Sequence, residues 1–76
     1  MVTTNATSQS IAEVVTAALS EARIAQRDAA ARTGIPFTTL RRRLTGYSPF
    51  NMAELILIAD LLGKPLSDLI LMAEAA

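Results

Sequence analysis

The sequence predicts a compact all-α domain of five short helices. Apolar residues recur every three or four positions along most of the 76-residue chain, which is the spacing of helices that pack one face against a core. Apolar residues make up 51% of the chain and aromatic residues only 4%, so we expect an aliphatic core. Glycine and proline fall between the periodic segments, where they end one helix before the next begins. A chain of this length is expected to form one domain.

The composition excludes several classes of protein. The chain has no cysteine and no histidine, which argues against disulfides, zinc fingers and most nucleophile–base catalysis. The carboxylates are scattered along the chain, so we expect no enzyme, no cofactor and no metal site. The longest apolar run, residues 55–59, is far shorter than a membrane span. The N-terminus lacks the features of a signal peptide, so we expect a cytoplasmic protein.

Residues 1–9 are polar and without periodicity, and we expect a flexible tail there, followed by the domain over residues 10–76. Ser10 and Glu13 have the spacing of a capping box. This predicts a first helix over residues 11–23, with a start near Thr7 as the alternative. Its core-facing stripe comprises Ile11, Val14, Val15, Ala18, Leu19 and Ala22.

Two short helices separated by a tight break are predicted over residues 26–33 and 37–44. Gly34 follows the first, where a left-handed backbone favours glycine. Pro36 precedes the second, where its missing N–H does no harm. Gly46 ends the second helix. This is the layout of a helix-turn-helix, whose second helix enters the major groove of DNA.

The helix over residues 37–44 has an apolar back and a Thr/Arg front. Leu40 and Leu44 share one face, and Thr38, Arg41 and Arg42 fall on the opposite side of a helical wheel. The net charge of the chain is zero, but six of its seven basic residues are arginines between positions 23 and 43. We therefore expect one basic end, suited to phosphates and guanine edges, and one acidic end.

The last third of the chain is predicted to form two more helices. Asn51 and Glu54 match a second capping box, so a helix is expected over residues 52–62, ending at Gly63, with a fifth helix from about residue 66. Apolar side chains surround most of both helices, so the fourth is expected to be buried on more than one side. Three arrangements are open for the apolar surface of the fifth helix. Its neighbours cover it, it forms the contact of a dimer, or it packs on another domain of a longer protein.

The chain resembles the lambda-repressor and Cro family of DNA-binding proteins, in particular small proteins of actinobacterial temperate phages. The resemblance rests on Gln26, Ala30, Gly34-Ile35, Leu40, Gly46 and the segment 58–66. It implies a sequence-specific transcriptional regulator, a repressor or Cro-like protein in a bacterial host cell, that binds double-stranded DNA. A homodimer through the C-terminal helix is a further expectation.

The resemblance also implies roles for individual residues. Those expected to contact bases are Phe37, Thr38, Arg41 and Arg42, of which Arg41 can also contact the backbone. For the DNA backbone the resemblance implies Gln26, Thr39 and Thr45. Arg27, Arg43 and Tyr47 are also expected there, because of their charge or hydroxyl. The alternative for Arg27 and Tyr47 is a solvated surface position, and for Gln26 a residue that only opens its helix.

Some of these roles have alternatives. Phe37 either touches a thymine methyl or closes the core behind Pro36. Arg43 either contacts a phosphate or pairs within the protein with Glu21 or Glu54. The alternative for the whole chain is a protein-interaction module, such as an antitoxin-like partner that docks through its apolar C-terminal helix.

Overall fold

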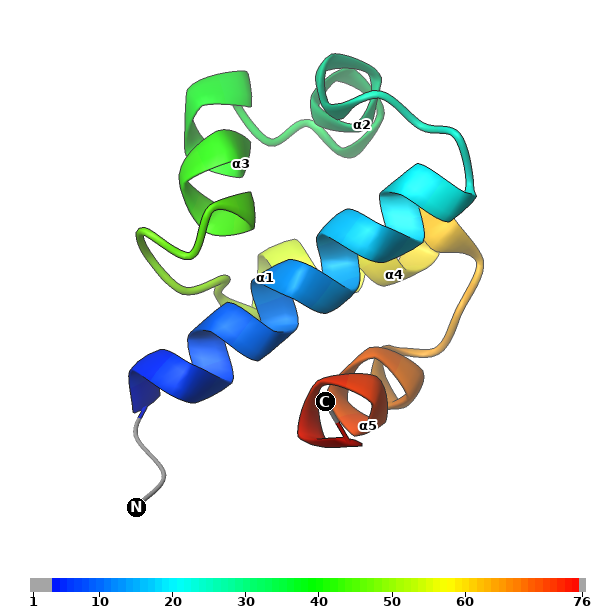
Figure 1. Ribbon diagram of the computed structural model, residues 1–76. Helices are drawn as coiled ribbons and strands as arrows, with labels where there is room; N and C mark the ends of the chain where they lie inside the picture. The colour runs from blue at the N-terminus through cyan, green and yellow to red at the C-terminus, as the bar shows by residue number, and fades with distance from the viewer. Residues whose placement is uncertain (1–3, 76) are drawn as a thin grey trace.

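The computed structural model describes residues 4–75, and side chains from residue 10 onward. Within these residues the chain forms five helices and no strand, which confirms the predicted all-α class. They are α1 (Thr4–Glu21), α2 (Gln26–Thr33), α3 (Phe37–Leu44), α4 (Met52–Leu62) and α5 (Leu66–Ala75) (Figure 1).

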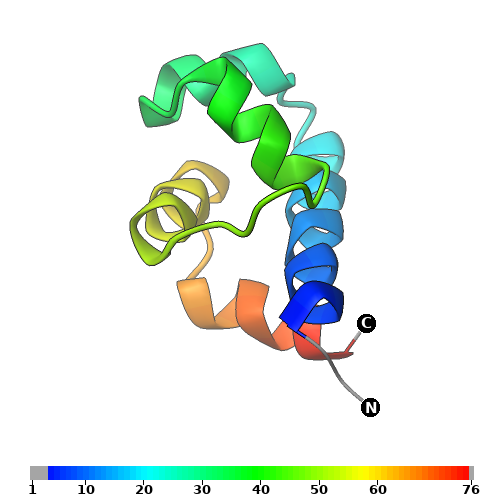
Figure 2. The ribbon, with the colours of Figure 1, turned by 90° about the vertical axis from the view of Figure 1, so that its left-hand side faces the viewer.

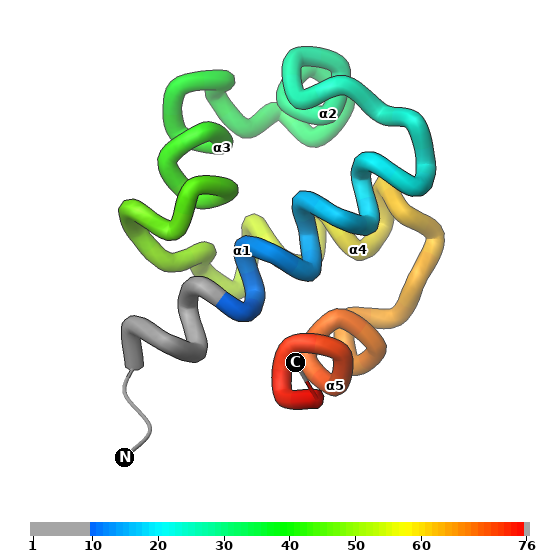
Figure 3. Tube along the Cα trace, in the orientation of Figure 1, coloured from blue at the N-terminus to red at the C-terminus, as the bar shows by residue number. Residues whose placement is uncertain are grey.

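The helices α2 and α3 lie at one end of the domain and α5 lies at the other. The long helix α1 runs between the two ends and packs against α3, α4 and α5 (Figures 1 and 2). The Cα trace shows α4 behind α1, bridging the α2–α3 pair to α5 (Figure 3). The arrangement presents α3 at one end of the molecule, supported from behind by α1 and α2.

The core is aliphatic, as predicted. Its largest fully buried side chains are Val15, Leu40, Ile58 and Leu69, which come from four different helices. Burial of one such side chain contributes about 1.5–3 kcal/mol. Because Leu40 belongs to this shared core, the orientation of α3 is fixed by the same contacts that hold the domain together.

Helix α1 is longer at its N-terminus than predicted and ends earlier. It begins at Thr4, so Ser10 lies inside the helix and cannot be its N-cap. No glycine or proline interrupts residues 4–9, so nothing local stops the helix there. The predicted tail thus overlaps α1, and its residues 1–3 lie outside the described part of the chain. Ala22, expected in the core, is exposed beyond the helix end.

The turn after α1 is formed by an arginine in a conformation that usually requires glycine. Arg23 has a φ of 59°. Its N–H donates to the Ser20 carbonyl at 3.0 Å and the Ile24 N–H donates to the Leu19 carbonyl at 2.9 Å, which is the bond pattern of a Schellman cap. Sequence periodicity extended the helix through Arg23 because no glycine marked this end.

The predicted bounds of α2 and α3 are confirmed. Gly34 has a φ of 81°, and its N–H donates to the Ala30 carbonyl at 2.9 Å to close α2. At the end of α3, Gly46 also has a φ of 81°. There the Tyr47 N–H donates to the Arg42 carbonyl at 3.0 Å, so the last turn of α3 is capped by its own backbone.

The bounds of α4 and its capping box are confirmed, but its expected burial on several sides is wrong. The Asn51 side chain accepts from the Glu54 N–H, and the Glu54 carboxylate accepts from the Asn51 N–H. Ile56 and Leu57 are 46% and 40% exposed, because α1, α2 and α5 cover the opposite side of this helix. None of the helices among the described residues combines the length and hydrophobicity needed to cross a bilayer.

Candidate nucleic-acid interface

Helix α3 turns its leucine side inward and its Thr/Arg side outward, as the helical wheel predicted. Leu40 is completely buried and Leu44 is 8% exposed. Thr38, Arg41 and Arg42 are exposed. Because its inner side is anchored in the core, α3 holds the backbone of these outer residues at a fixed spacing, from which their side chains can reach base edges.

A shallow groove of about 400 Å³ runs along this outer face. We call it the α3 groove; its lining residues are Phe37, Thr38, Arg41, Arg42, Thr45 and Tyr47. All six were predicted to contact DNA, and the structure brings them together on one surface. The lining combines hydroxyls, guanidinium groups and aromatic rings, and it includes no carboxylate, so it suits an anionic ligand with flat groups.

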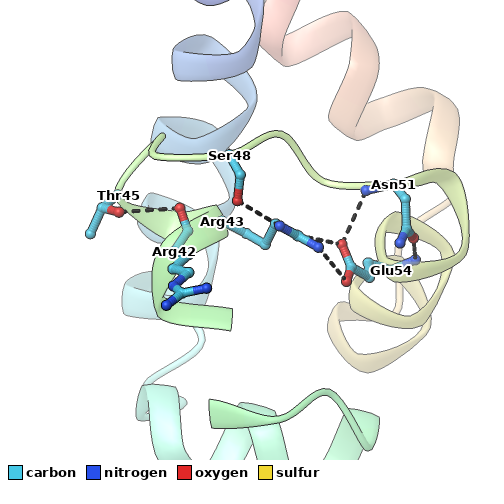
Figure 4. Close-up of polar contacts among 6 residues, drawn as sticks. All are labelled: Arg42, Arg43, Thr45, Ser48, Asn51 and Glu54. Carbon is cyan, nitrogen blue, oxygen red and sulfur yellow. Dashed lines mark hydrogen bonds and ion pairs between the residues drawn. The ribbon is translucent and has the colours of Figure 1, made fainter. Parts of the chain in front are cut away.

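Arg43 points away from the α3 groove and forms an ion pair inside the protein. Its Nε lies 2.8 Å from Oε1 of Glu54, and its Nη2 lies 3.3 Å from Oε2 (Figure 4). Its Nη1 donates to the Ser48 hydroxyl. Of the two roles open for Arg43, the structure contains the pair with Glu54. Three of its five N–H donors are engaged by the protein, so the phosphate contact predicted for Arg43 would have to compete with this pair.

The Glu54 carboxylate joins the end of α3 to the start of α4. It accepts from Arg43 and also from the backbone N–H of Asn51, at 3.0 Å (Figure 4). The hydrogen bond from Arg43 is the main cause that lowers the pKa of Glu54, and burial opposes it. The same bond raises the pKa of Arg43. The pair therefore stays charged and keeps the two helices in a fixed relation.

Arg42 and Arg43 are consecutive but point in different directions (Figure 4). The Arg42 guanidinium lies 6.0 Å from the centroid of the Tyr47 ring, within the range of a cation–π contact. Tyr47 itself is 80% exposed. Arg42 thus stands over the α3 groove with an aromatic neighbour.

Phe37 is half-buried against the core, and two arginines lie over its ring. The Cζ atoms of Arg27 and Arg41 are 4.2 Å and 5.9 Å from the ring centroid. Phe37 therefore packs in part against the core, which is one of the two roles predicted for it. Its ring also lies beneath arginines from α2 and α3. Sequence reasoning missed these contacts, since Arg27 and Phe37 are ten residues apart and meet only through the angle between α2 and α3.

The remaining predicted residues lie around this surface in different environments. Gln26 is exposed at the first position of α2, and Thr39 is half-buried on the flank of α3. The Thr45 hydroxyl donates to the Arg42 carbonyl at 3.1 Å, so it must release this bond before it can donate to a phosphate. Ser48 was not predicted as a site residue. Its hydroxyl accepts a hydrogen bond from Arg43 and so helps to hold that side chain away from the α3 groove.

The comparisons with known proteins agree with this geometry. A family model described as "Helix-turn-helix" matches residues 18–69, more than half of the chain. The matched region begins within α1, includes all of α2, α3 and α4, and ends within α5. No curated protein and no solved structure matches the chain.

Proposed function

The chain belongs to the helix-turn-helix family of the lambda-repressor and Cro type, a family of DNA-binding domains, and from this premise we propose that it is a sequence-specific transcriptional regulator. In this proposal α3 enters the major groove of an operator. The observation that carries it is the α3 groove, an exposed surface of threonines, arginines and aromatic rings on a helix whose other side is buried.

We assign the base-reading role chiefly to Arg42. Its guanidinium is exposed over the α3 groove and can form two hydrogen bonds with O6 and N7 of guanine, worth about 1–3 kcal/mol of discrimination. Thr38 is exposed one turn earlier on the same face. Gln26 and Arg27, at the start of α2, are assigned to the DNA backbone, since the first helix of this motif crosses the phosphates.

We further propose that the protein acts as a repressor, of phage type and within a bacterial cell, by occupying its operator. A two-fold dimer would read a palindrome with half-sites about one helical turn apart. The exposed apolar side chains Leu71 and Met72 on α5, 62% and 41% exposed, are our candidates for the dimer contact. They also support the second candidate, a module that docks another protein through α5.

Selection of bound duplexes from random DNA tests the proposal directly. Recovery of a defined sequence supports a regulator, and a palindrome supports the dimer. No bound DNA at low salt, together with a tight protein partner, would favour the docking module.

Two substitutions then separate base reading from backbone contact. Arg42→Ala should lower affinity for the selected duplex much more than for a scrambled one. Gln26→Ala should weaken both duplexes similarly. Lys64→Ala is the matched control, since it removes one positive charge between α4 and α5. Equal losses on both duplexes for Arg42→Ala would refute its base-reading role.

A further inference from the structure

One aromatic ring gathers the guanidinium groups of two helices at the edge of the α3 groove. Phe37 is the first residue of α3 and packs its inner side against the core. Arg27 reaches its ring from α2, at 4.2 Å, and Arg41 reaches it from the next turn of α3, at 5.9 Å. Resting on the proposed DNA binding, we propose that Phe37 is a positioning residue that holds Arg27 and Arg41 as a pair for the DNA backbone phosphates.

The electrostatics of the three side chains support this role. The face of an aromatic ring carries partial negative charge and attracts a guanidinium group. Two cations held near one ring also repel each other, and a phosphate that accepts hydrogen bonds from both relieves this repulsion. The neighbouring carboxylate Asp28 does not neutralise Arg27 in this arrangement, because it pairs with Arg32 at 3.4 Å.

The same geometry limits the surface of the Phe37 ring that is open to a thymine methyl. A separation of 4.2 Å between the Arg27 Cζ and the ring centroid is van der Waals contact, so Arg27 covers one face of the ring. Phe37 and Arg41 line the α3 groove, whereas Arg27 does not. The ring therefore stands on the side of the groove that faces α2, where the motif places phosphates.

The test measures how Phe37 and Arg27 depend on each other in DNA binding. The variants are Phe37→Leu, Phe37→Tyr, Arg27→Ala and the Phe37→Leu/Arg27→Ala double variant. Each is titrated with the duplex recovered by selection and with a scrambled duplex, both of about 30 base pairs so that two half-sites fit. Phe37→Leu keeps an apolar side chain against the core, and Phe37→Tyr keeps the ring.

If Phe37 positions the two arginines for phosphates, its replacement should lower DNA affinity without changing the preference for the selected duplex over the scrambled one. Phe37→Leu should lower affinity about two- to five-fold, the worth of an exposed cation–π contact, by the same factor on both duplexes. Phe37→Tyr, which keeps the ring, should lose clearly less affinity than Phe37→Leu. In the Arg27→Ala background the effect of Phe37→Leu should be clearly smaller, because the ring then positions only Arg41, the more distant of the two arginines.

Three results would overturn the inference. One is a Phe37→Leu loss confined to the selected duplex and traced to one thymine. Another is full additivity of Phe37→Leu and Arg27→Ala. The third is the absence of a ring-current shift on the Arg27 side-chain protons in the NMR spectrum of the unaltered protein, a measurement that does not depend on any variant folding. Failure of the unaltered protein to bind either duplex would instead refute the proposed function, and this inference with it.

Discussion

The ion pair between Arg43 and Glu54 gives the sharpest test of how α3 is held, and we expect it to stabilise the domain measurably. We suggest a double-mutant cycle of Arg43→Met, Glu54→Gln and both together. Methionine keeps the long apolar stem of Arg43. Glutamine keeps an acceptor for the Asn51 N–H, so the cap of α4 is retained while the charge is removed.

The structure sets the expected magnitude. The pair has one short bond, 2.8 Å, and one longer bond, 3.3 Å, and the two side chains are only 21% and 12% exposed. Exposed pairs contribute about 0.2–1 kcal/mol, whereas hydrogen bonds to charged groups contribute about 1.5–3 kcal/mol. We expect a coupling energy of about 1–2 kcal/mol. A single substitution that removes this amount should lower the Tm by about 4–16 °C in a domain of this size.

Urea unfolding at neutral pH measures the coupling, and the exposed pair of α2 supplies a matched control. Arg32 and Asp28 lie 3.4 Å apart with both side chains 54% exposed, so the cycle of Arg32→Met and Asp28→Asn should give a coupling below about 0.5 kcal/mol. If the Arg43–Glu54 coupling is no larger than this control, our account of how α3 joins α4 is wrong.

The same variants test whether Arg43 contacts DNA in addition to Glu54. At a temperature where all variants are folded, Arg43→Met should leave the salt dependence of binding unchanged. Arg41→Met should reduce its slope by about 0.9, the effect of losing one phosphate contact. A reduced slope for Arg43→Met would return Arg43 to the DNA-contacting set.

Three further predictions concern stability. Because Arg43 lowers the pKa of Glu54, the pair stabilises the domain above the ordinary pKa of a glutamate, and this contribution is lost as the pH falls through the lowered value. Acid titration followed by circular dichroism should therefore show a loss of stability below about pH 4.3 that Glu54→Gln reduces. Arg23→Gly should raise the free energy of unfolding by about 0.5–1 kcal/mol, since Arg23 occupies a left-handed conformation, and Arg23→Ala, which removes the guanidinium but keeps the Cβ, should not. Gly34→Ala should cost about 1 kcal/mol in urea unfolding through its φ of 81° alone, because a Cβ there meets nothing within 4 Å; a cost near zero would contradict this reasoning.

Most helix boundaries could be predicted because they are set by short-range bonds. The ends of α2 and α3 follow from Gly34 and Gly46, whose backbone bonds reach back no more than five residues. The start of α4 follows from the bonds between Asn51 and Glu54. Where such a marker was absent the prediction failed, as at the end of α1, where Arg23 takes the place that glycine usually occupies.

The candidate site could likewise be predicted only where spacing along one helix decides the position of a residue. Helical spacing is enough to assign the outer face of α3 to Thr38, Arg41 and Arg42. It places them opposite the apolar face formed by Leu40 and Leu44. The partner of Arg43 could not be chosen, since Glu21 and Glu54 were both available and only the tertiary structure brings Glu54 within reach of Arg43.

The sequence by itself determined the bounds of α2, α3 and α4 and which side of α3 is apolar, since these depend on contacts within a few residues. Only the tertiary structure decided which arginines remain available to a ligand. Arg43 pairs with Glu54 from α4, while Arg27 and Arg41 each lie over the ring of Phe37. The physical reason is that a long side chain on a helix flank can reach several neighbours, and the angle between helices selects among them. Spacing along the chain does not encode that angle.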